Sequence, residues 1–218
     1  FTVPNGKKVA IVGPTGAGKS TISRLLFKFY DPKEGNIYIN NTNINNISQN
    51  SLRKIIGVVP QDTVLFNDSI YYNIAYGNAS SSKEEVIKAA KNADIHNFIN
   101  SLPDGYKTIV GERGLKLSGG EKQRVAIART ILKNPKIFFF DEATSALDTS
   151  TEKEIQKNLE NISAGKTTLI IAHRLSTAAN ADNIIVLDQG AIIEQGTHQS
   201  LLLEKGKYFE MWEKQKPS

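Results

Sequence analysis

The segment that most constrains the fold is a glycine-rich stretch near the start of the chain, Gly-Pro-Thr-Gly-Ala-Gly-Lys-Ser at residues 13–20. It follows the short apolar run Lys8–Val12, which is typical of a buried strand. After it, apolar residues recur at helical spacing between residues 20 and 30, up to Asp31-Pro32. A strand, a glycine-rich loop and a helix in this order predict the first unit of a parallel sheet that is covered by helices.

The rest of the chain continues this alternation of strands and helices. Further strands are predicted at 55–59, 137–140, 167–172, 184–187 and 191–194. Tight turns are predicted at Asn40-Asn41, within a hairpin, and at Asp188-Gln189-Gly190. From Ser69 to Ser101 the strand signals vanish and helical ones dominate, and helices are predicted at 83–91, 94–100 and 121–133. The pattern therefore predicts an α/β core over 1–61 and 133–218, an antiparallel β lobe, and an inserted helical subdomain over 62–132.

Composition excludes several classes of protein. No apolar run exceeds four residues, so no segment is long enough to span a bilayer, and any membrane part is expected outside these residues. The chain has no cysteine, which excludes a disulfide scaffold. Its 27 Lys and Arg residues are scattered rather than clustered, which favours a mildly basic surface over a nucleic-acid site.

The glycine-rich stretch matches the P-loop pattern in the expected context of a preceding strand and a following helix. Such a loop lets backbone N–H groups point at phosphate oxygens. We expect Lys19 to reach the β- and γ-phosphates, the Ser20 hydroxyl to bind Mg²⁺ and Thr21 to contact the α-phosphate side. The predicted phosphate site consists of Gly13, Pro14, Thr15, Gly16, Ala17, Gly18, Lys19, Ser20 and Thr21. A purely structural glycine turn is the alternative.

Two carboxylates follow the apolar strand predicted at 137–140. Ligands of an open parallel sheet bind at the carboxyl ends of its strands, where Asp141 and Glu142 are expected to lie. Asp141 is predicted to hold the magnesium shell, and Glu142 to act as the general base or water-orienting residue for attack on the γ-phosphate. On its own this run is equally consistent with an ordinary strand end.

The stretch Leu-Ser-Gly-Gly-Glu-Lys-Gln-Arg at 117–124 resembles the signature motif of ABC ATPases, and this resemblance extends over essentially the whole chain. It implies a single ABC ATPase domain over 1–218 with a P-loop NTPase (RecA-like) core, binding ATP and Mg²⁺. In this family the signature contacts the ATP held by a partner cassette. The residues that the resemblance assigns to this trans contact are Ser118, Gly119, Gly120 and Gln123.

The remaining family motifs occur in the expected order. Gln61 matches the glutamine that joins the magnesium shell and senses the membrane domain, and His173 matches the switch histidine that contacts the γ-phosphate. The resemblance thus implies Lys19, Glu142 and His173 as the catalytic set, with Ser20, Gln61 and Asp141 at the metal. The loop that crosses the dimer interface is matched by Ser145, Ala146, Leu147 and Asp148. Residues 108–114 resemble a loop of exporters that touches the coupling helices of the membrane domain.

Three stretches, at 58–68, 116–124 and 181–188, are most similar to subfamily B half-transporters of the heavy-metal-tolerance and mitochondrial iron–sulfur-export type. The resemblance implies an ATPase that powers export, with thiol–metal conjugates as candidate cargo. Its implied partners are a second copy of the cassette and a transmembrane domain of the same polypeptide, without nucleic acid. The cassette of such a polytopic membrane protein would face the cytosol or the mitochondrial matrix.

Other members of the same family remain as alternatives. A multidrug or peptide exporter belongs to the same subfamily but usually varies within the stretch at 58–68. A soluble ABC ATPase acting on nucleic acid or ribosomes shares the P-loop, the signature and the carboxylates and is expected to lack the exporter loop. A catalytically dead regulatory cassette is disfavoured because the predicted catalytic residues are all intact. The family stacks adenine on an aromatic residue well upstream of the P-loop, and because only twelve residues precede Gly13 we expect that aromatic to lie before Phe1.

Overall fold

The computed structural model describes residues 1–114, 116–141, 143 and 149–215. The chain divides into two compact units. The first comprises Phe1–Ile56, Lys136–Glu142 and Gly165–Ser218, and the second comprises Gly57–Pro135 and Ala143–Ala164. The predicted helical subdomain at 62–132 lies within the second unit, which also takes in 143–164 because the helix after residue 148 packs on the helices of this unit.

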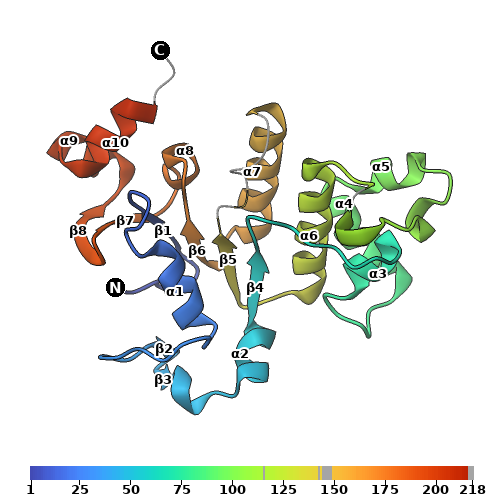
Figure 1. Cartoon of the computed structure of the whole chain (residues 1–218), viewed down its shortest axis with the longest axis horizontal. Coiled ribbons are helices and arrows are strands. Elements are labelled where there is room, and N and C mark those ends of the chain that lie inside the picture. The colour runs from blue at the N-terminus through green and yellow to red at the C-terminus, as the bar shows by residue number, and fades with distance from the viewer. Residues whose placement is uncertain (115, 142, 144–148, 216–218) are drawn as a thin grey trace. The chain divides into compact units, whose positions relative to one another are not determined.

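The core of the first unit is a sheet in which neighbouring strands follow the order β5-β6-β1-β7-β8 (Figure 1). Its strands are β1 (Lys8–Val12), β5 (Ile137–Asp141), β6 (Thr167–Ile171), β7 (Asn183–Asp188) and β8 (Ala191–Gly196). The strands β5, β6, β1 and β7 are parallel to one another, and β8 runs antiparallel to β7. Residues 9–12 of β1 are completely buried, as expected for a strand enclosed in a parallel sheet. The predicted α/β fold with a mainly parallel sheet is confirmed.

A small antiparallel hairpin follows the first helix. The elements here are α1 (Lys19–Leu26), β2 (Tyr38–Ile39), β3 (Thr42–Asn43), a 3-10 turn (Ile44–Asn46) and α2 (Gln49–Ile55), which leads into β4 (Ile56–Val59). Asn40 and Asn41 both have positive φ, as predicted for the hairpin turn. The sequence did not predict α2, whose start is capped by the Ser48 side chain.

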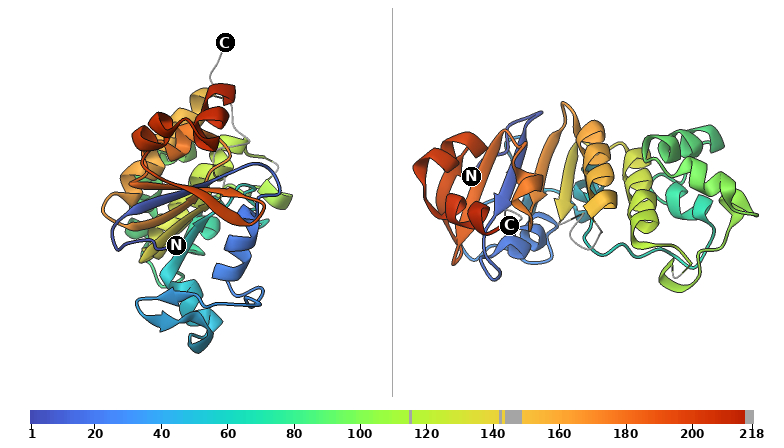
Figure 2. Two further views of the ribbon diagram at one scale, coloured as in Figure 1. Left: turned by 90° about the vertical axis from the view of Figure 1, so that its left-hand side faces the viewer. Right: turned by 90° about the horizontal axis from the view of Figure 1, so that it is seen from above.

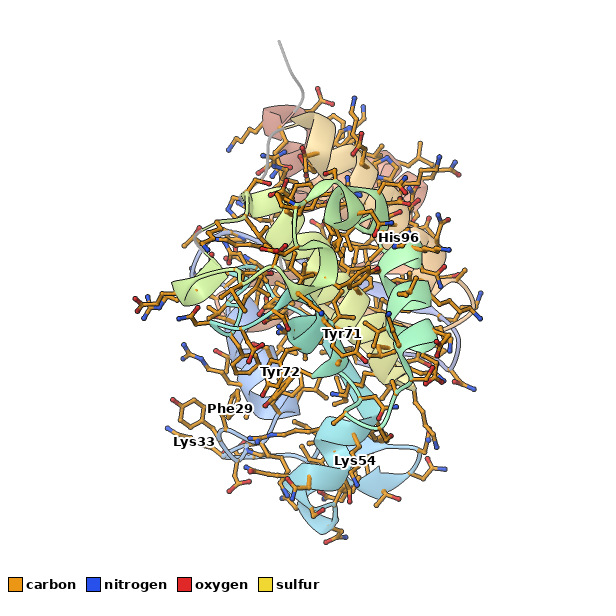
Figure 3. The ribbon with its side chains drawn as sticks, turned by 90° about the vertical axis from the view of Figure 1, so that its right-hand side faces the viewer. Phe29, Lys33, Lys54, Tyr71, Tyr72 and His96 are labelled. Carbon is orange, nitrogen blue, oxygen red and sulfur yellow. The ribbon has the colours of Figure 1, made fainter. Side chains whose placement is uncertain are left out.

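The first helix is shorter than predicted. It ends at Leu26, and Lys28 has a φ of 54°, in the left-handed region that a helix cannot continue through. This bend is held by two hydrogen bonds, from Lys28 Nζ to the carbonyl of Ile47 and from Gln49 Nε2 to the carbonyl of Lys28. The helical spacing of Phe29 was therefore misleading, and its side chain projects from the ribbon with 60% of its surface exposed (Figure 3).

Three short helices complete the first unit: α8 (Leu175–Ala178), α9 (His198–Glu204) and α10 (Lys207–Gln215). The Glu194 carboxylate, on β8, accepts hydrogen bonds from the backbone N–H groups of Lys207 and Tyr208 and so holds the start of α10. Tyr208 is fully buried, and its hydroxyl lies 2.7 Å from Nδ1 of His198. His198 is half-buried in this contact.

Alkaline pH is expected to destabilise the chain through Tyr208. Burial raises the pKa of Tyr208 to about 12, from 10.0. The folded state therefore keeps this proton while the unfolded state releases it, so stability present below about pH 10 is lost as the pH rises towards 12. We expect a loss on the order of 2 kcal/mol, measured by urea unfolding followed through Trp212, whose ring stacks on that of Tyr208. Tyr208→Phe should show a smaller loss over this window; an equal loss would contradict the assignment.

The second unit is mainly helical. It contains α3 (Ile70–Ala75), α4 (Lys83–Asn92), α5 (His96–Ser101), α6 (Gly119–Lys133) and α7 (Thr149–Ser163), with 3-10 turns at Gly105–Lys107 and Glu112–Gly114. Helix α6 packs against α3 and α4 on one side and α7 on the other (Figure 2). Because α6 is covered on both sides, its residues 125–128 are buried.

A buried asparagine organises the start of this unit. Asn73 is fully buried, and its side-chain amide donates to the carbonyls of Phe66 and Ser69, both at 3.0 Å. Its Oδ1 accepts from the Phe66 N–H at 2.8 Å and from Arg129 Nη2 at 3.0 Å. The Arg129 guanidinium also lies over two aromatic rings, 5.7 Å from the centroid of Phe66 and 5.8 Å from that of Tyr76. We call Phe66, Tyr72 and Tyr76, which are mutually in contact and 42–57% exposed, the surface aromatic cluster.

Candidate nucleotide-binding site

The predicted phosphate loop connects β1 to α1 in the first unit. Gly13 is required by a close approach between backbones, because a Cβ at this position would lie 2.2 Å from the carbonyl oxygen of Leu187 on β7. Gly16 and Gly18 have φ angles of 84° and 101°, in the left-handed region that favours glycine. The loop passes from a fully buried strand to an exposed turn at Thr15 and Gly16. Its path therefore depends on glycines at the positions that the sequence pattern specifies.

Lys19 lies inside the curve of this loop. Its ammonium donates hydrogen bonds to the carbonyls of Gly13 at 2.8 Å and Pro14 at 3.0 Å, and only 8% of the residue is exposed. It begins α1, a helix whose N-cap, Gly18, provides no side-chain hydrogen bond and whose first turn has no acidic residue. A buried cation and an uncapped helix start thus combine at one end of the helix, an arrangement that attracts anions.

Asp141 and the loop that begins at Ala172 lie at the same edge of the sheet as the phosphate loop. The parallel strands β5, β6 and β1 are neighbours, and their register places Asp141 beside Ile171 and Ile171 beside Ile11. Asp141 therefore ends its strand at the level of Ile11, two residues before Gly13, and His173 follows two residues after Ile171. Of the predicted residues in the first unit, this edge brings together the phosphate loop, Asp141 and His173.

The C-terminal helix holds the loop that carries His173. Gln215 Nε2, at the end of α10, donates to the carbonyl of His173 at 3.1 Å. Its Oε1 accepts from the N–H of Leu175, the first residue of α8, at 2.8 Å. The His173 residue itself is exposed. Gln215 and Leu175 are 40 residues apart, and no sequence pattern indicates that they are in contact. This support for the loop was therefore not predicted.

The predicted signature residues lie at the start of α6 in the second unit. Ser118 caps the helix, accepting from the N–H of Glu121 at 3.3 Å while its own N–H donates to the Glu121 carboxylate at 2.7 Å. Ser118 and Gly119 are exposed. A Cβ at Gly120 would lie 2.7 Å from Cγ2 of Thr151, so this position has little room for a side chain. The helix therefore presents its N-terminal backbone at the surface of the unit.

Two predicted glutamines of the second unit have different environments. Gln61 is exposed. Gln123 is 3% exposed, and its amide is bound at both ends within the unit, by the Thr63 hydroxyl at 2.6 Å and the Pro60 carbonyl at 3.0 Å. The Gln123 side chain, predicted to contact ATP across the dimer, is therefore engaged by the segment around Gln61. Thr63 has no recognisable sequence signal and was not predicted as a site residue.

Several predicted residues lie outside the described part of the chain. They are Glu142, Ser145, Ala146, Leu147 and Asp148. Their roles as catalytic base and dimer loop remain predictions from the sequence.

The described residues fit a nucleotide with its magnesium ion. The curved loop around Lys19 and the uncapped start of α1 suit phosphate oxygens. Within the described residues no cluster of three or more His, Cys, Asp or Glu side chains forms a dedicated metal site. Mg²⁺ typically takes only one or two protein ligands and completes its shell with phosphate oxygens and water, so Ser20 and Asp141 have the expected chemistry.

Comparison with known proteins identifies the class to which this fold and site belong. Residues 1–145 match the family model described as "ABC transporter". The chain belongs to the ABC transporter family, of which it contains the ATP-binding, ATP-hydrolysing domain.

The relatives refine this assignment to one branch. The chain is 61% identical over 215 residues to the ATM1-type heavy metal exporter of Novosphingobium aromaticivorans, covering 99% of this chain and 35% of that protein. It is 59% identical over 215 residues to heavy metal tolerance factor 1 of Caenorhabditis elegans, covering 99% and 27%. A solved bacterial Atm1-family ABC exporter with ATP bound superposes with a TM-score of 0.94 at 60% identity, covering 100% of this chain and 38% of that one. The predicted subfamily B branch is confirmed.

The chain therefore spans about a quarter to a third of the length of these two relatives. Among the described helices, none is both long and apolar enough to cross a membrane.

Proposed function

We propose that this domain powers export by a half-transporter in which two copies of the cassette close on two ATP molecules and reopen after hydrolysis. The observation that carries the proposal is the arrangement in the first unit, where Lys19, Asp141 and the His173 loop share one edge of a parallel sheet. The exposed start of α6 supports the second part, because the backbone N–H groups around the exposed Gly119 are available to a nucleotide held by another copy.

In this proposal each residue has a limited task. Lys19 neutralises charge on the β- and γ-phosphates, and the backbone of the phosphate loop fixes their position. Ser20, Gln61 and Asp141 would hold Mg²⁺, which would supply further charge neutralisation. Glu142 orients the attacking water and accepts its proton, while His173 contacts the γ-phosphate. Phosphoryl transfer depends mainly on such positioning, so a site completed only by dimer closure couples hydrolysis to movement.

Glu142→Gln is expected to trap the closed dimer. The amide keeps the shape of the carboxylate but accepts a proton poorly, so ATP would bind without being hydrolysed. Light scattering of this variant should give the mass of a dimer with ATP and of a monomer with ADP. Asp182→Asn is a matched control, because Asp182 pairs with Lys7 and lies outside the proposed site. The Asp182→Asn variant should hydrolyse ATP normally. A Glu142→Gln variant that stays monomeric at every ATP concentration would refute ATP-driven dimerisation.

We also propose that the cargo is a thiol–metal conjugate, and that the transporter resides in a membrane with this domain on the cytosolic or matrix side. The support is the similarity to exporters named for heavy metals and, at 58% identity over 216 residues, to the mitochondrial iron–sulfur clusters transporter ABCB7 of Oryzias latipes. Glutathione–metal conjugates should stimulate ATP hydrolysis by the complete transporter in lipid. Stimulation by lipophilic drugs alone would instead indicate a multidrug exporter.

A further inference from the structure

A single buried side chain holds both sides of the exposed dipeptide Gln61-Asp62. Gln123 Nε2 donates to the carbonyl of Pro60 at 3.0 Å, immediately before the dipeptide. Gln123 Oε1 accepts from the hydroxyl of Thr63 at 2.6 Å, immediately after it. Pro60 and Thr63 thus bind the same amide group, while Gln61 and Asp62 between them are exposed.

The chemistry of these partners fixes the orientation of the amide. A carbonyl oxygen only accepts hydrogen bonds, so the Gln123 group that meets Pro60 must be its NH₂. The oxygen then faces Thr63, whose hydroxyl has a proton to donate. Both ends of this buried amide are satisfied, which is the condition for burying it without a large loss of stability. If the amide were turned by 180°, its oxygen would face the carbonyl oxygen of Pro60, and neither could donate a hydrogen bond.

The same helix face holds the preceding strand. Thr130, two turns after Gln123 on α6, donates from its hydroxyl to the carbonyl of Val58 at 2.9 Å. Gly57 lies so close to α6 that a Cβ there would be 2.8 Å from Cγ2 of Thr130. Residues 57–63 are therefore fastened along α6 at successive points, and the last of these is Gln123. The N-terminal end of the same helix is the signature residue Ser118.

We propose that Gln123 and Thr63 are positioning residues that fix the segment carrying Gln61 to the helix that begins at the signature motif. Through these hydrogen bonds, a displacement of Gln61 is transmitted to Ser118, and the reverse. Gln123 therefore acts through Gln61 rather than by touching nucleotide. The inference rests on the proposed function, because it gives Gln61 its place in the magnesium shell.

Removing the Thr63 hydroxyl tests this inference in the complete transporter in lipid. Thr63→Val keeps the shape of the side chain but cannot donate to Gln123. We expect kcat to fall about tenfold, the effect of losing one hydrogen bond, and the Mg²⁺ concentration for half-maximal activity to rise several-fold. ATP affinity measured without Mg²⁺ should not change, because Lys19 is untouched. Thr63→Ser restores the hydroxyl and should restore both values.

Gln123→Glu provides a second variant in case Thr63→Val folds poorly. The carboxylate still accepts from Thr63 but has no N–H for the Pro60 carbonyl, so the same rise in the Mg²⁺ requirement is expected. Thr42→Val is the matched control, since Thr42 is exposed in the β2–β3 hairpin, and it should behave as wild type.

The outcomes separate this inference from the function on which it rests. A lower melting temperature with an unchanged Mg²⁺ requirement would mean that the bridge is only structural and would overturn the inference. Normal activity of both Thr63→Val and Gln123→Glu would also overturn it, while leaving the proposed function intact. An inactive wild-type transporter would refute the proposed function itself.

Discussion

Replacement of Lys19 by alanine is expected to abolish ATP binding. The substitution removes the buried cation and also its two hydrogen bonds to the carbonyls of Gly13 and Pro14, so both the charge and a brace of the phosphate loop are lost. We expect the dissociation constant for MgATP to rise roughly 100-fold or more, about 2.7 kcal/mol or greater. Isothermal titration calorimetry measures this directly.

Lys33→Ala is the matched control for this experiment. Lys33, labelled in Figure 3, is exposed and follows the C-terminal end of α1, whereas Lys19 begins this helix. The Lys33→Ala substitution removes one positive charge from the same unit, as Lys19→Ala does. A nonspecific effect of net charge would therefore weaken ATP binding in both variants. Unchanged ATP binding by Lys19→Ala would refute the phosphate site.

Replacement of Asn73 by leucine is expected to be the most damaging single change to the second unit. Leucine is similar in size but cannot make the four hydrogen bonds of the buried amide, and it leaves the N–H and carbonyl of Phe66 without these partners. Unpaired buried polar groups each cost about 1–3 kcal/mol, so we expect a loss of about 3–5 kcal/mol. Hydrogen exchange of amides in α3, α4 and α6 should accelerate by roughly 100-fold or more.

Asn97→Leu serves as the control for that loss. Asn97 lies on α5 in the same unit and is exposed, so the same replacement there should leave exchange in α6 close to wild type. Normal exchange in the Asn73→Leu variant would show that the local network carries little of the stability of the unit.

The strands, and the placement of the phosphate loop and Asp141 at one edge of the sheet, were predictable because their signals are local. The phosphate loop combines glycines at fixed spacing with an apolar strand before it, and each predicted strand of the large sheet is a short apolar run. Asn40-Asn41 was identified as a turn because Asn tolerates positive φ, and both residues have it. In the other predicted turn, Asp188-Gln189-Gly190, Gln189 and Gly190 have positive φ. Parallel strands then place Asp141 and His173 at one edge, whatever the details of packing.

What the sequence did not indicate depends on contacts between distant residues. The bend after Leu26 is held both by local backbone hydrogen bonds and by bonds of Lys28 with Ile47 and Gln49, 19 and 21 residues away, while the apolar spacing continues to Phe29. The partners of Gln123 are separated from it by 60 and 63 residues. The signature motif predicted that Gln123 contacts nucleotide, whereas its buried amide is hydrogen-bonded to Thr63 and Pro60 of the same unit. The link between Gln215 and the His173 loop was equally inaccessible.

The contacts of α6 connect its N-terminal end, at Ser118, with the surface aromatic cluster near its C-terminal end, so that a tilt of the helix would move both. It carries Ser118 at its start, Gln123 one turn further, and Arg129 under the surface aromatic cluster near its end. A helix of 15 residues is about 22 Å long and behaves as a stiff rod. A tilt of about 10° around its middle would therefore move its two ends in opposite directions by about 2 Å each. A push on the surface aromatic cluster would reach Ser118 as a displacement comparable to the length of a hydrogen bond, without any change in the fold of the unit.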